Sequence, residues 1–421
     1  MWQKFQRMWK VKDLRNSILF VLGMLVILRA TAHIPVPGVN TEGLRQLFAG
    51  NQVLGLLNVF SGGTIKNFSI VMLGVAPYIT SSIIFQLLVM VVPSLEEMQK
   101  EGESGQQKIN MYTRILSVPL AVLQAFGLIK LLSSTQATIL GDVNTFKWVA
   151  ILTTVTAGTV FLMWIGELIT DKRIGNGISI LIFAGIVAAL PTAVQNAIVN
   201  YTSSDLTTYI LFAIIAVVTI VGVVIITEGQ RNIPISYARQ VRGRGAGANS
   251  SLPLRVNMAG VIPIIFAISV VLFPPMIAQL FVNGTGFLAR ASGVIINLFN
   301  NQIFYGALYF LLVFGFTYFY TAVIFRPEKM AEDLQRQGAF IPGIRPGKQT
   351  EEYLAKTMNR LLFSGATFLA AIAILPLLMT AVTSSQFMAI GGTSLLIIVS
   401  VAIDIAKQVD SQLTMHAYER V

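Results

Sequence analysis

Side chains able to carry out chemistry are scarce in this sequence. It has no cysteine and only two histidines, His33 and His416, so a thiolate or histidine metal site is not expected. Residues 174–204, 256–289 and 361–403 contain no Asp, Glu, Lys or Arg. Ion-coupled transporters and intramembrane enzymes keep ionisable groups at membrane depth, because those groups carry out the transport or the catalysis. The sequence therefore predicts no catalytic residue, no metal and no cofactor.

The elements that must position the remaining polar groups are membrane spans. The chain is 54% hydrophobic and only 12% charged, whereas a soluble domain carries about 25% charged residues. Mean hydropathy is +0.71. At about 20 residues per spanning helix, there is room for about ten spans. Apolar runs of suitable length fall near 17–34, 70–92, 114–133, 148–168, 178–198, 207–227, 259–281, 303–325, 361–381 and 389–406.

The basic residues predict how these spans are oriented. With a cytoplasmic N-terminus, 24 of the 30 Lys and Arg residues fall in cytoplasmic segments and 6 on the opposite side. The positive-inside rule then places both termini in the cytoplasm. This orientation leaves two long cytoplasmic loops, at 228–258 and 326–360. Loops of that length are usually functional or disordered.

The N-terminal residues 1–16 are basic and aromatic. Trp2, Phe5 and Trp9 lie at helical spacing among lysines and arginines, which predicts an amphipathic helix on an anionic membrane surface. A frayed basic tail is the alternative. No small-residue cleavage site follows the apolar run from Ile18, so a cleavable signal peptide is not expected.

A short motif occurs at matching places in the two halves of the chain. Residues 74–77 read GVAP in the second span, and residues 260–263 read GVIP in the seventh. An odd number of spans per half places the halves in opposite orientations, which predicts an inverted repeat with a pathway between them. A chance match is the alternative, because Gly and Pro are frequent in membrane helices. We expect an all-α polytopic membrane protein with ten transmembrane helices in two inverted pseudo-symmetric halves, at 17–200 and 201–421.

One apolar segment is too short to cross a bilayer. A helix over residues 55–67 is about 20 Å long, against a hydrocarbon core of about 30 Å. Such backbone is tolerated at membrane depth only inside protein or a water-filled cavity. These residues fit a movable stopper in a pore, and they fit equally a re-entrant helix that never moves. The residues in question are Asn58, Phe60, Ser61, Gly62, Gly63, Thr64, Lys66 and Asn67.

Several long motifs give the sequence a family resemblance over essentially its whole length. These motifs, their order along the chain and the ten predicted spans resemble those of the SecY family. Its members are the central subunits of the bacterial protein-translocation channel. The resemblance implies a clam shell of two five-helix halves around an hourglass pore, with a plug at 55–67. The motifs are LGVAPYITSSIIFQLL, RIGNGISILIFAGIVAALP, NMAGVIPIIFAISVVLFPP, IPGIRPG and GGTSLLI.

The resemblance also implies a pore ring and a lateral gate. A ring of branched apolar side chains closes around an extended chain without selecting its sequence, and it dewets when empty. By motif the ring falls on Ile79, Ile83, Ile182, Ile265 and Ile397. The gate lies between the second and third spans and the seventh and eighth, with Thr80, Gln124 and Ser269 near this seam. Ordinary helix–helix hydrogen bonding is the alternative role for Gln124.

The two long loops resemble the family's docking site for the ribosome or the ATPase SecA. Pro-Gly pairs flank Arg345 in IPGIRPG and predict a rigid turn. Residues 243–253 depart from the family, because they read as a flexible linker. The predicted docking residues are Arg231, Arg239, Arg242, Arg345 and Lys348. The implied partners are SecE-like and SecG-like small membrane subunits, SecA, the ribosome, signal sequences, unfolded preproteins and the lipid of the bacterial plasma membrane.

Three hypotheses about function follow from these features. The preferred one is a passive, gated protein-conducting channel that takes its energy from outside, because the chain has no nucleotide-binding P-loop. A small-molecule permease with inverted-repeat architecture is the alternative, and it would need deep charges or a polar cluster. An intramembrane enzyme is disfavoured by the same missing groups.

Overall fold

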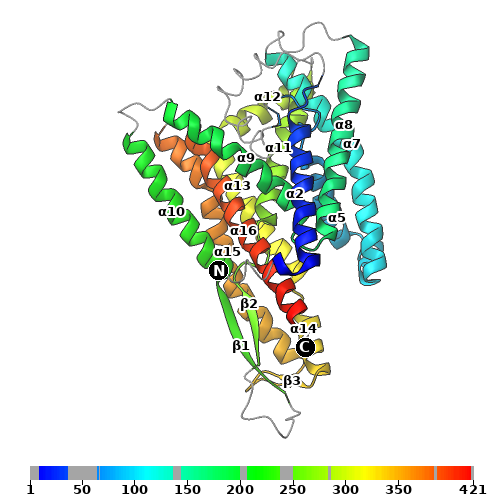
Figure 1. Cartoon of the computed structure of the whole chain (residues 1–421), viewed down its shortest axis with the longest axis vertical. Coiled ribbons are helices and arrows are strands. Elements are labelled where there is room, and N and C mark those ends of the chain that lie inside the picture. The colour runs from blue at the N-terminus through cyan, green and yellow to red at the C-terminus, as the bar shows by residue number, and fades with distance from the viewer. Residues whose placement is uncertain are drawn as a thin grey trace.

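The protein is a bundle of long helices from which a small β-sheet projects at one end (Figure 1). The computed structural model describes residues 9–36, 64–65, 67–135, 144–199, 206–237, 250–282, 286–383 and 386–418. The helices of the first half are α2 (Lys12–Ala32), α5 (Ala76–Val91), α6 (Pro93–Lys100), α7 (Glu103–Thr135), α8 (Thr145–Asp171) and α9 (Gly177–Val199).

The second half contains both helices and strands. Its helices are α10 (Leu206–Glu228), α11 (Ile262–Phe281), α12 (Phe287–Asn300), α13 (Gln302–Ile324), α14 (Pro327–Arg336), α15 (Lys348–Thr383) and α16 (Gln386–Tyr418). Its strands are β1 (Gln230–Tyr237), β2 (Ser250–Arg255) and β3 (Ala339–Phe340), in the antiparallel order β2-β1-β3. We call the end of the bundle that carries these strands and α14 the hairpin end (Figure 1).

All ten predicted apolar runs lie on helices, namely α2, α5, α7 to α11, α13, α15 and α16. Within the described residues, six helices are long and apolar enough to cross a membrane, and the bent pair α5–α6 would be a seventh. Internal prolines limit the straight apolar part of α9 and of α11. The small sheet is an addition to the predicted all-helical chain.

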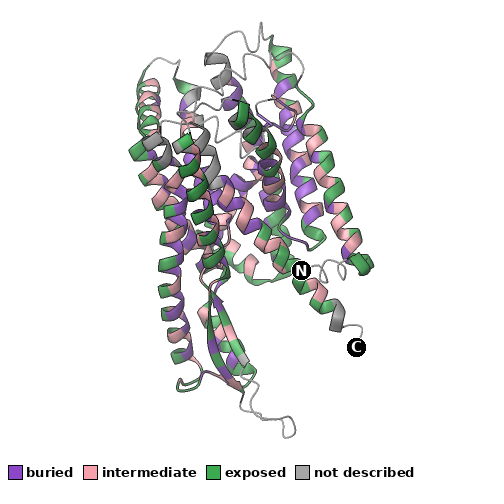
Figure 2. Cartoon of the chain, turned by 60° about the vertical axis from the view of Figure 1, so that its left-hand side comes forward, coloured by how far each residue is buried: buried purple, intermediate pink, exposed green. Residues whose placement is uncertain are grey.

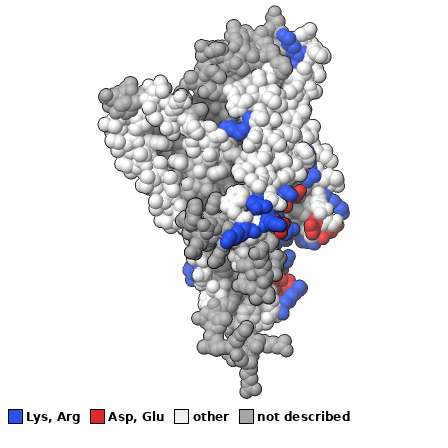
Figure 3. Space-filling view, viewed as in Figure 1, with Lys and Arg blue, Asp and Glu red and all other residues white. Residues whose placement is uncertain are grey.

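The outer surface of the bundle suits lipid. Successive turns of α10 expose large apolar side chains, including Ile214, Val218 and Ile225, and Figure 2 shows exposed and buried residues mixed along the peripheral helices. In Figure 3 the charged side chains gather toward the hairpin end, and a broad band beyond them holds few. A charge-poor band with an apolar surface is expected of the part that lies in the bilayer.

The second predicted span starts later than the sequence indicated. The prediction began it at Ile70, but residues 67–75 are turns and bridges, and α5 starts only at Ala76. Pro35 pairs with Ser69 in an antiparallel bridge, and the N–H of Ile70 donates to the carbonyl of Ile34 at 3.0 Å. This irregular backbone is buried against α7 and α8, which is the condition for irregular backbone at membrane depth.

The predicted loop at 326–360 is largely ordered secondary structure. It contains α14, β3 and the first turns of α15, and the loop at 228–258 contains the β1–β2 hairpin. Strand β1 pairs with β2 on one side and with β3 on the other. Together with α14 and the start of α15 they enclose a hydrophobic core of their own, which includes Ile233, Leu254, Phe325, Ile341 and Leu354. We call this body the docking unit, after the docking residues that the sequence predicts on it.

Candidate functional site

The two Gly-Val-x-Pro motifs adopt the same backbone. Gly74 has φ 59° and Gly260 has φ 62°, a left-handed conformation that glycine adopts without steric cost. In each motif the following valine caps a helix, and a proline lies in its first turn. The two copies of the motif therefore form the same local turn at the start of a helix.

The repeat places two predicted ring residues at equivalent positions. Ile79 of α5 and Ile265 of α11 each lie five residues after the glycine. The N–H of Ile79 donates to the carbonyl of Val75 at 3.1 Å, and the N–H of Ile265 donates to the carbonyl of Val261 at 3.2 Å. Both side chains therefore project from the first turn of their helices.

One small apolar cavity brings the predicted ring and seam residues together. Its volume is about 60 Å³. Ile79, Ile182 and Ile265 reach it from α5, α9 and α11, which belong to both halves of the chain. The same cavity is lined by all three predicted seam residues, Thr80, Gln124 and Ser269.

The other two predicted ring residues lie in the same hydrophobic cluster without lining that cavity. Ile83 lies one turn after Ile79 on α5, and Ile397 lies on α16. All five isoleucines are buried. The structure thus places Ile79, Ile182 and Ile265 around one space, and it places Ile83 and Ile397 in the packing around them.

The polar contacts of the seam residues lie on one side of the seam or within one helix. Gln124 donates from Nε2 to Oγ1 of Thr80 at 3.4 Å, which joins α7 to α5 on one side of the seam. Ser269 donates back to the carbonyl of Ile265 in its own helix at 2.9 Å. The helices on the two sides, α5 and α7 against α11, meet here through mainly apolar contacts.

On the first-half side of the seam, polar contacts join α5, α7 and α8 to one another. Ser81 donates to the carbonyl of Thr113 at 2.6 Å, which ties α5 to α7. Arg114 forms an ion pair with Glu167 at 2.5 Å, which ties α7 to α8. These bonds make α5, α7 and α8 one connected body. Sequence reasoning missed this pair, although its two charges stood out at the ends of apolar runs.

Most of the predicted plug lies outside the described residues. Thr64 and Ile65, at its C-terminal end, are buried. Thr64 donates from Oγ1 to the carbonyl of Met72 at 3.3 Å, and Ile65 also lines the 60 Å³ cavity. The end of the plug segment therefore reaches the ring. Asn67 is half-buried in a turn, and Asn58, Phe60, Ser61, Gly62, Gly63 and Lys66 lie outside the description.

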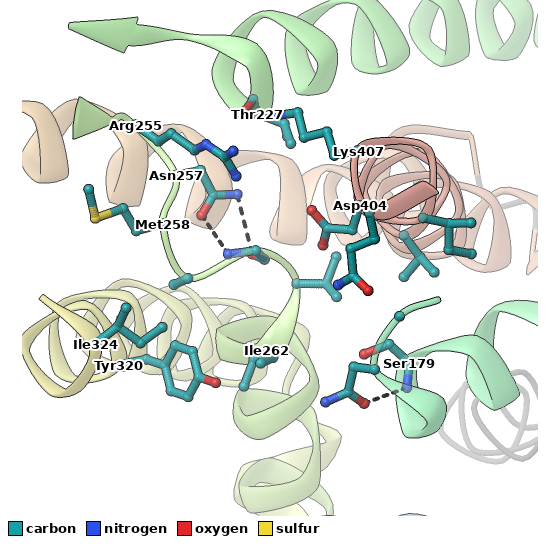
Figure 4. A pocket seen from close by; sticks show the side chains of 18 of the residues that line it. Ser179, Thr227, Arg255, Asn257, Met258, Ile262, Tyr320, Ile324, Asp404 and Lys407 are labelled. Carbon is teal, nitrogen blue, oxygen red and sulfur yellow. Dashed lines mark hydrogen bonds between the residues drawn. The ribbon is translucent and has the colours of Figure 1, made fainter. Parts of the chain in front are cut away.

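We call the two Gly-Val-x-Pro turns junctions. The second junction, at Gly260, borders a polar pocket of about 170 Å³ (Figure 4). Asn257 accepts from the N–H of Gly260 at 3.0 Å and donates to its carbonyl at 3.3 Å. Lys407 of α16 forms an ion pair with Glu228 at 2.9 Å. The Asp404 carboxylate also lines the pocket. Asn257 was missed from the sequence, although an Asn three residues before a turn glycine is a recognisable local signal.

Three of the five predicted docking residues lie on the docking unit. Arg345 and Lys348 are exposed, and Arg231 is exposed on β1. Gly343 (φ 83°) and Gly347 (φ 95°) on either side of Arg345 form the expected tight turns. Arg239 and Arg242 lie outside the described residues, as do residues 243–249 of the predicted flexible linker. Its residues 250–253 form part of strand β2, so the linker prediction was wrong there, because these residues pair with β1.

These features define a class of protein: a polytopic helical membrane protein whose two halves meet around a small apolar cavity. The chain belongs to the SecY family, whose profile matches residues 69–406.

Relatives of known name agree with this assignment. The chain is 42% identical over 433 residues to the protein translocase subunit SecY of Thermotoga maritima, covering 100% of this chain and 97% of the relative. It is 42% identical over 420 residues to that of Vibrio cholerae, covering 98% and 94%.

Solved structures share the fold. A protein-conducting channel superposes with a TM-score of 0.64 at 18% identity, covering 93% of this chain and 90% of that chain. A structure concerning the SecY plug domain has a TM-score of 0.63 at 17% identity, with the same coverage. Sec61 in a canine ribosome-channel complex has a TM-score of 0.61 at 17% identity.

Proposed function

We propose that this chain is the pore-forming subunit of a gated protein-conducting channel in the bacterial plasma membrane. It passes unfolded secretory polypeptide across the membrane and releases transmembrane segments sideways into lipid. The observation that carries the proposal is the shared cavity of the ring isoleucines and the seam residues, in a chain of the SecY family. Family membership also decides against the permease alternative.

The ring acts as a compliant gasket. Ile79, Ile182 and Ile265 present branched apolar side chains from three different helices, and Ile83 and Ile397 support them. Apolar side chains form no directional bonds, so they can close around an extended chain of any sequence. When no chain is present, so narrow an apolar space excludes water and resists ion flow.

The seam acts as the lateral exit. Polar contacts bind α5, α7 and α8 into one body, whereas this body meets α11 through mainly apolar surface. An apolar signal or transmembrane segment can replace that surface with its own at little cost, because lipid and side chains are similarly apolar. The plug at 55–67, whose described end reaches the ring, closes the outer side.

The orientation and the partners follow from the charged end of the molecule. The hairpin end carries most of the charged side chains visible in Figure 3, so we place it and both termini in the cytoplasm. The docking unit offers Arg231, Arg345 and Lys348 to SecA or the ribosome. SecE-like and SecG-like subunits complete the channel. Transport energy comes from the docked partner, and the chain itself performs no catalytic step.

A reconstituted transport assay tests this function. Proteoliposomes containing the chain, its small subunits and an ATP-driven motor are given a secretory precursor, and protease protection of the precursor is scored. We expect ATP-dependent protection that is lost without the chain. Protection that does not depend on the chain would contradict the proposal. So would free passage of small solutes without transport of polypeptide.

A further inference from the structure

One hydrogen bond between the two halves lies at the hairpin end, away from the ring, and involves Arg326; elsewhere Gln412 of α16 also bonds across the halves, to the carbonyl of Arg173 at 2.7 Å. Arg326 donates from Nη2 to Oε1 of Gln99 at 2.9 Å. Gln99 lies on α6, which connects α5 to α7, and Arg326 lies between α13 and α14, as the N-cap of α14. The bond therefore bridges the two sides of the seam, between residues 227 positions apart in sequence.

Helix α6 is fixed to the first-half side of the seam. It follows α5 after one residue, at a bend of 99°. A Cβ added to Gly105 of α7 would lie 1.7 Å from the carbonyl oxygen of Met98, so α6 and α7 are in close backbone contact. Lys108 also pairs with Glu101 at 3.2 Å. Gln99 therefore moves with α5 and α7.

Arg326 is fixed to the docking unit. The preceding residue, Phe325, is buried in the core of that unit together with Leu334 and Ile341. Its N–H donates to the carbonyl of Thr321 at 2.8 Å at the end of α13, and the N–H of Met330 donates to the carbonyl of Arg326 at 3.1 Å at the start of α14. A movement of the docking unit therefore displaces Arg326.

Helix α6 also carries a carboxylate whose charge interacts weakly with that of Arg326. Glu96 pairs with Lys100 at 2.7 Å, and the hydrogen bond from Lys100 lowers the pKa of Glu96, with a smaller lowering contribution from the charge of Arg326. The guanidinium of Arg326 is thus hydrogen-bonded to the side-chain oxygen of Gln99 and weakly attracted by the charge of Glu96 on the same short helix. Both interactions favour its present position.

We propose that Arg326 and Gln99 form a latch across the hairpin end of the seam, which holds the seam closed until docking displaces Arg326. The proposal rests on the proposed function of the seam as the lateral exit. One hydrogen bond of about 1 kcal/mol shifts an equilibrium by about fivefold. A bond of that strength biases the closed state and still yields to a docked partner.

Loss of the latch is the first test. Gln99→Ala and Arg326→Ala are compared with the unmodified chain for transport of a precursor whose signal sequence has been weakened. We expect about fivefold more transport of this precursor in both variants, and little change for a precursor with an intact signal. Arg336→Ala is the matched control, since Arg336 is also exposed but bonds to Glu332 on its own helix.

A fixed latch is the second test. The chain lacks cysteine, so Gln99→Cys with Arg326→Cys can be joined uniquely by a short bis-maleimide. We expect the join to block lateral release of an intact signal sequence, whereas each single variant treated alike releases it. The latch is overturned if Arg326→Ala behaves as Arg336→Ala, or if the joined protein still releases signals. Failure of the unmodified chain to transport any precursor would instead overturn the proposed function.

Discussion

The two Gly-Val-x-Pro junctions share a backbone but are held by different interactions. At the first, the N–H of Gly74 donates to the backbone carbonyl of Val71 at 2.9 Å, and the Val71 side chain is fully buried in the core. At the second, the N–H of Gly260 donates to the side-chain Oδ1 of Asn257 at 3.0 Å. Val71 and Asn257 each lie three residues before the glycine. The motif thus determines the local turn. The residue three positions before the glycine, which we call the anchor, determines which interaction holds the turn in place.

The surroundings of the two junctions explain this difference. The first is enclosed mainly by apolar side chains, beside a cavity of only about 20 Å³ that Arg29 and Thr64 also line. The second borders the polar pocket of about 170 Å³ with Asp404 and Lys407. A buried valine stabilises the first by packing, and a side-chain amide stabilises the second by directional bonds.

Exchanging the two anchors should have unequal effects. Val71→Asn buries an amide among apolar atoms, and we expect it to lower the free energy of unfolding by about 3 kcal/mol. The measurement is thermal unfolding in detergent. Val71→Ile, which keeps the site apolar, is the control. A loss below about 1 kcal/mol would show that packing does not anchor the first junction.

The left-handed glycines should be equally intolerant of a side chain. Gly74→Val and Gly260→Val each place a β-branched residue at positive φ, and we expect a loss of about 2 kcal/mol for each. Gly23→Ala is the control, since Gly23 lies inside α2 with open space around it and alanine there should add stability, by up to about 1 kcal/mol. A large difference between the two valine variants would contradict the shared backbone.

Removing the second anchor should have a smaller effect. Asn257→Val deletes both hydrogen bonds to Gly260, and we expect a loss of about 1–2 kcal/mol by thermal unfolding. Asn257→Asp keeps the acceptor for the Gly260 N–H and should lose less. If both variants match the unmodified chain, the side-chain clamp does not anchor this junction.

The ion pair beside the second junction should contribute least. Lys407 and Glu228 are both partly exposed, so Lys407→Ala should cost about 0.5 kcal/mol. Unfolding of both proteins in low salt and in about 1 M salt is the measurement, and the difference should shrink in high salt because exposed charges are screened. A larger, salt-independent loss would mean that Lys407 acts through packing or through its hydrogen bond to the carbonyl of Thr227, and not through the ion pair.

Much of this architecture could be predicted from the sequence because its signals are local. The ten apolar runs fall on helices, and the repeated GVxP motif predicted two equivalent turns. The start of α5 could not be predicted, because residues 70–75 are as apolar as a span, yet their backbone bonds to a segment more than thirty residues earlier.

The charged segments were harder to predict for a different reason. Helix α14 is polar over most of its surface and buries only Ala331 and Leu334 against the docking unit, so hydropathy alone suggested a loop. The Arg326–Gln99 bond is not visible in any local pattern. Assignment of the ring isoleucines needed the family motif, because a single buried isoleucine has no distinguishing chemistry.

The most direct test of the central claim is to ask whether polypeptide passes through the ring. A single cysteine at Ile182, in a chain that has no other, is reconstituted with a motor and a stalled precursor that carries one cysteine. Val218→Cys, on the exposed face of α10, is the control. The account predicts a disulfide at position 182 alone, dependent on ATP and on the position of the precursor's cysteine. Cross-linking at position 218 but not at 182 would contradict it.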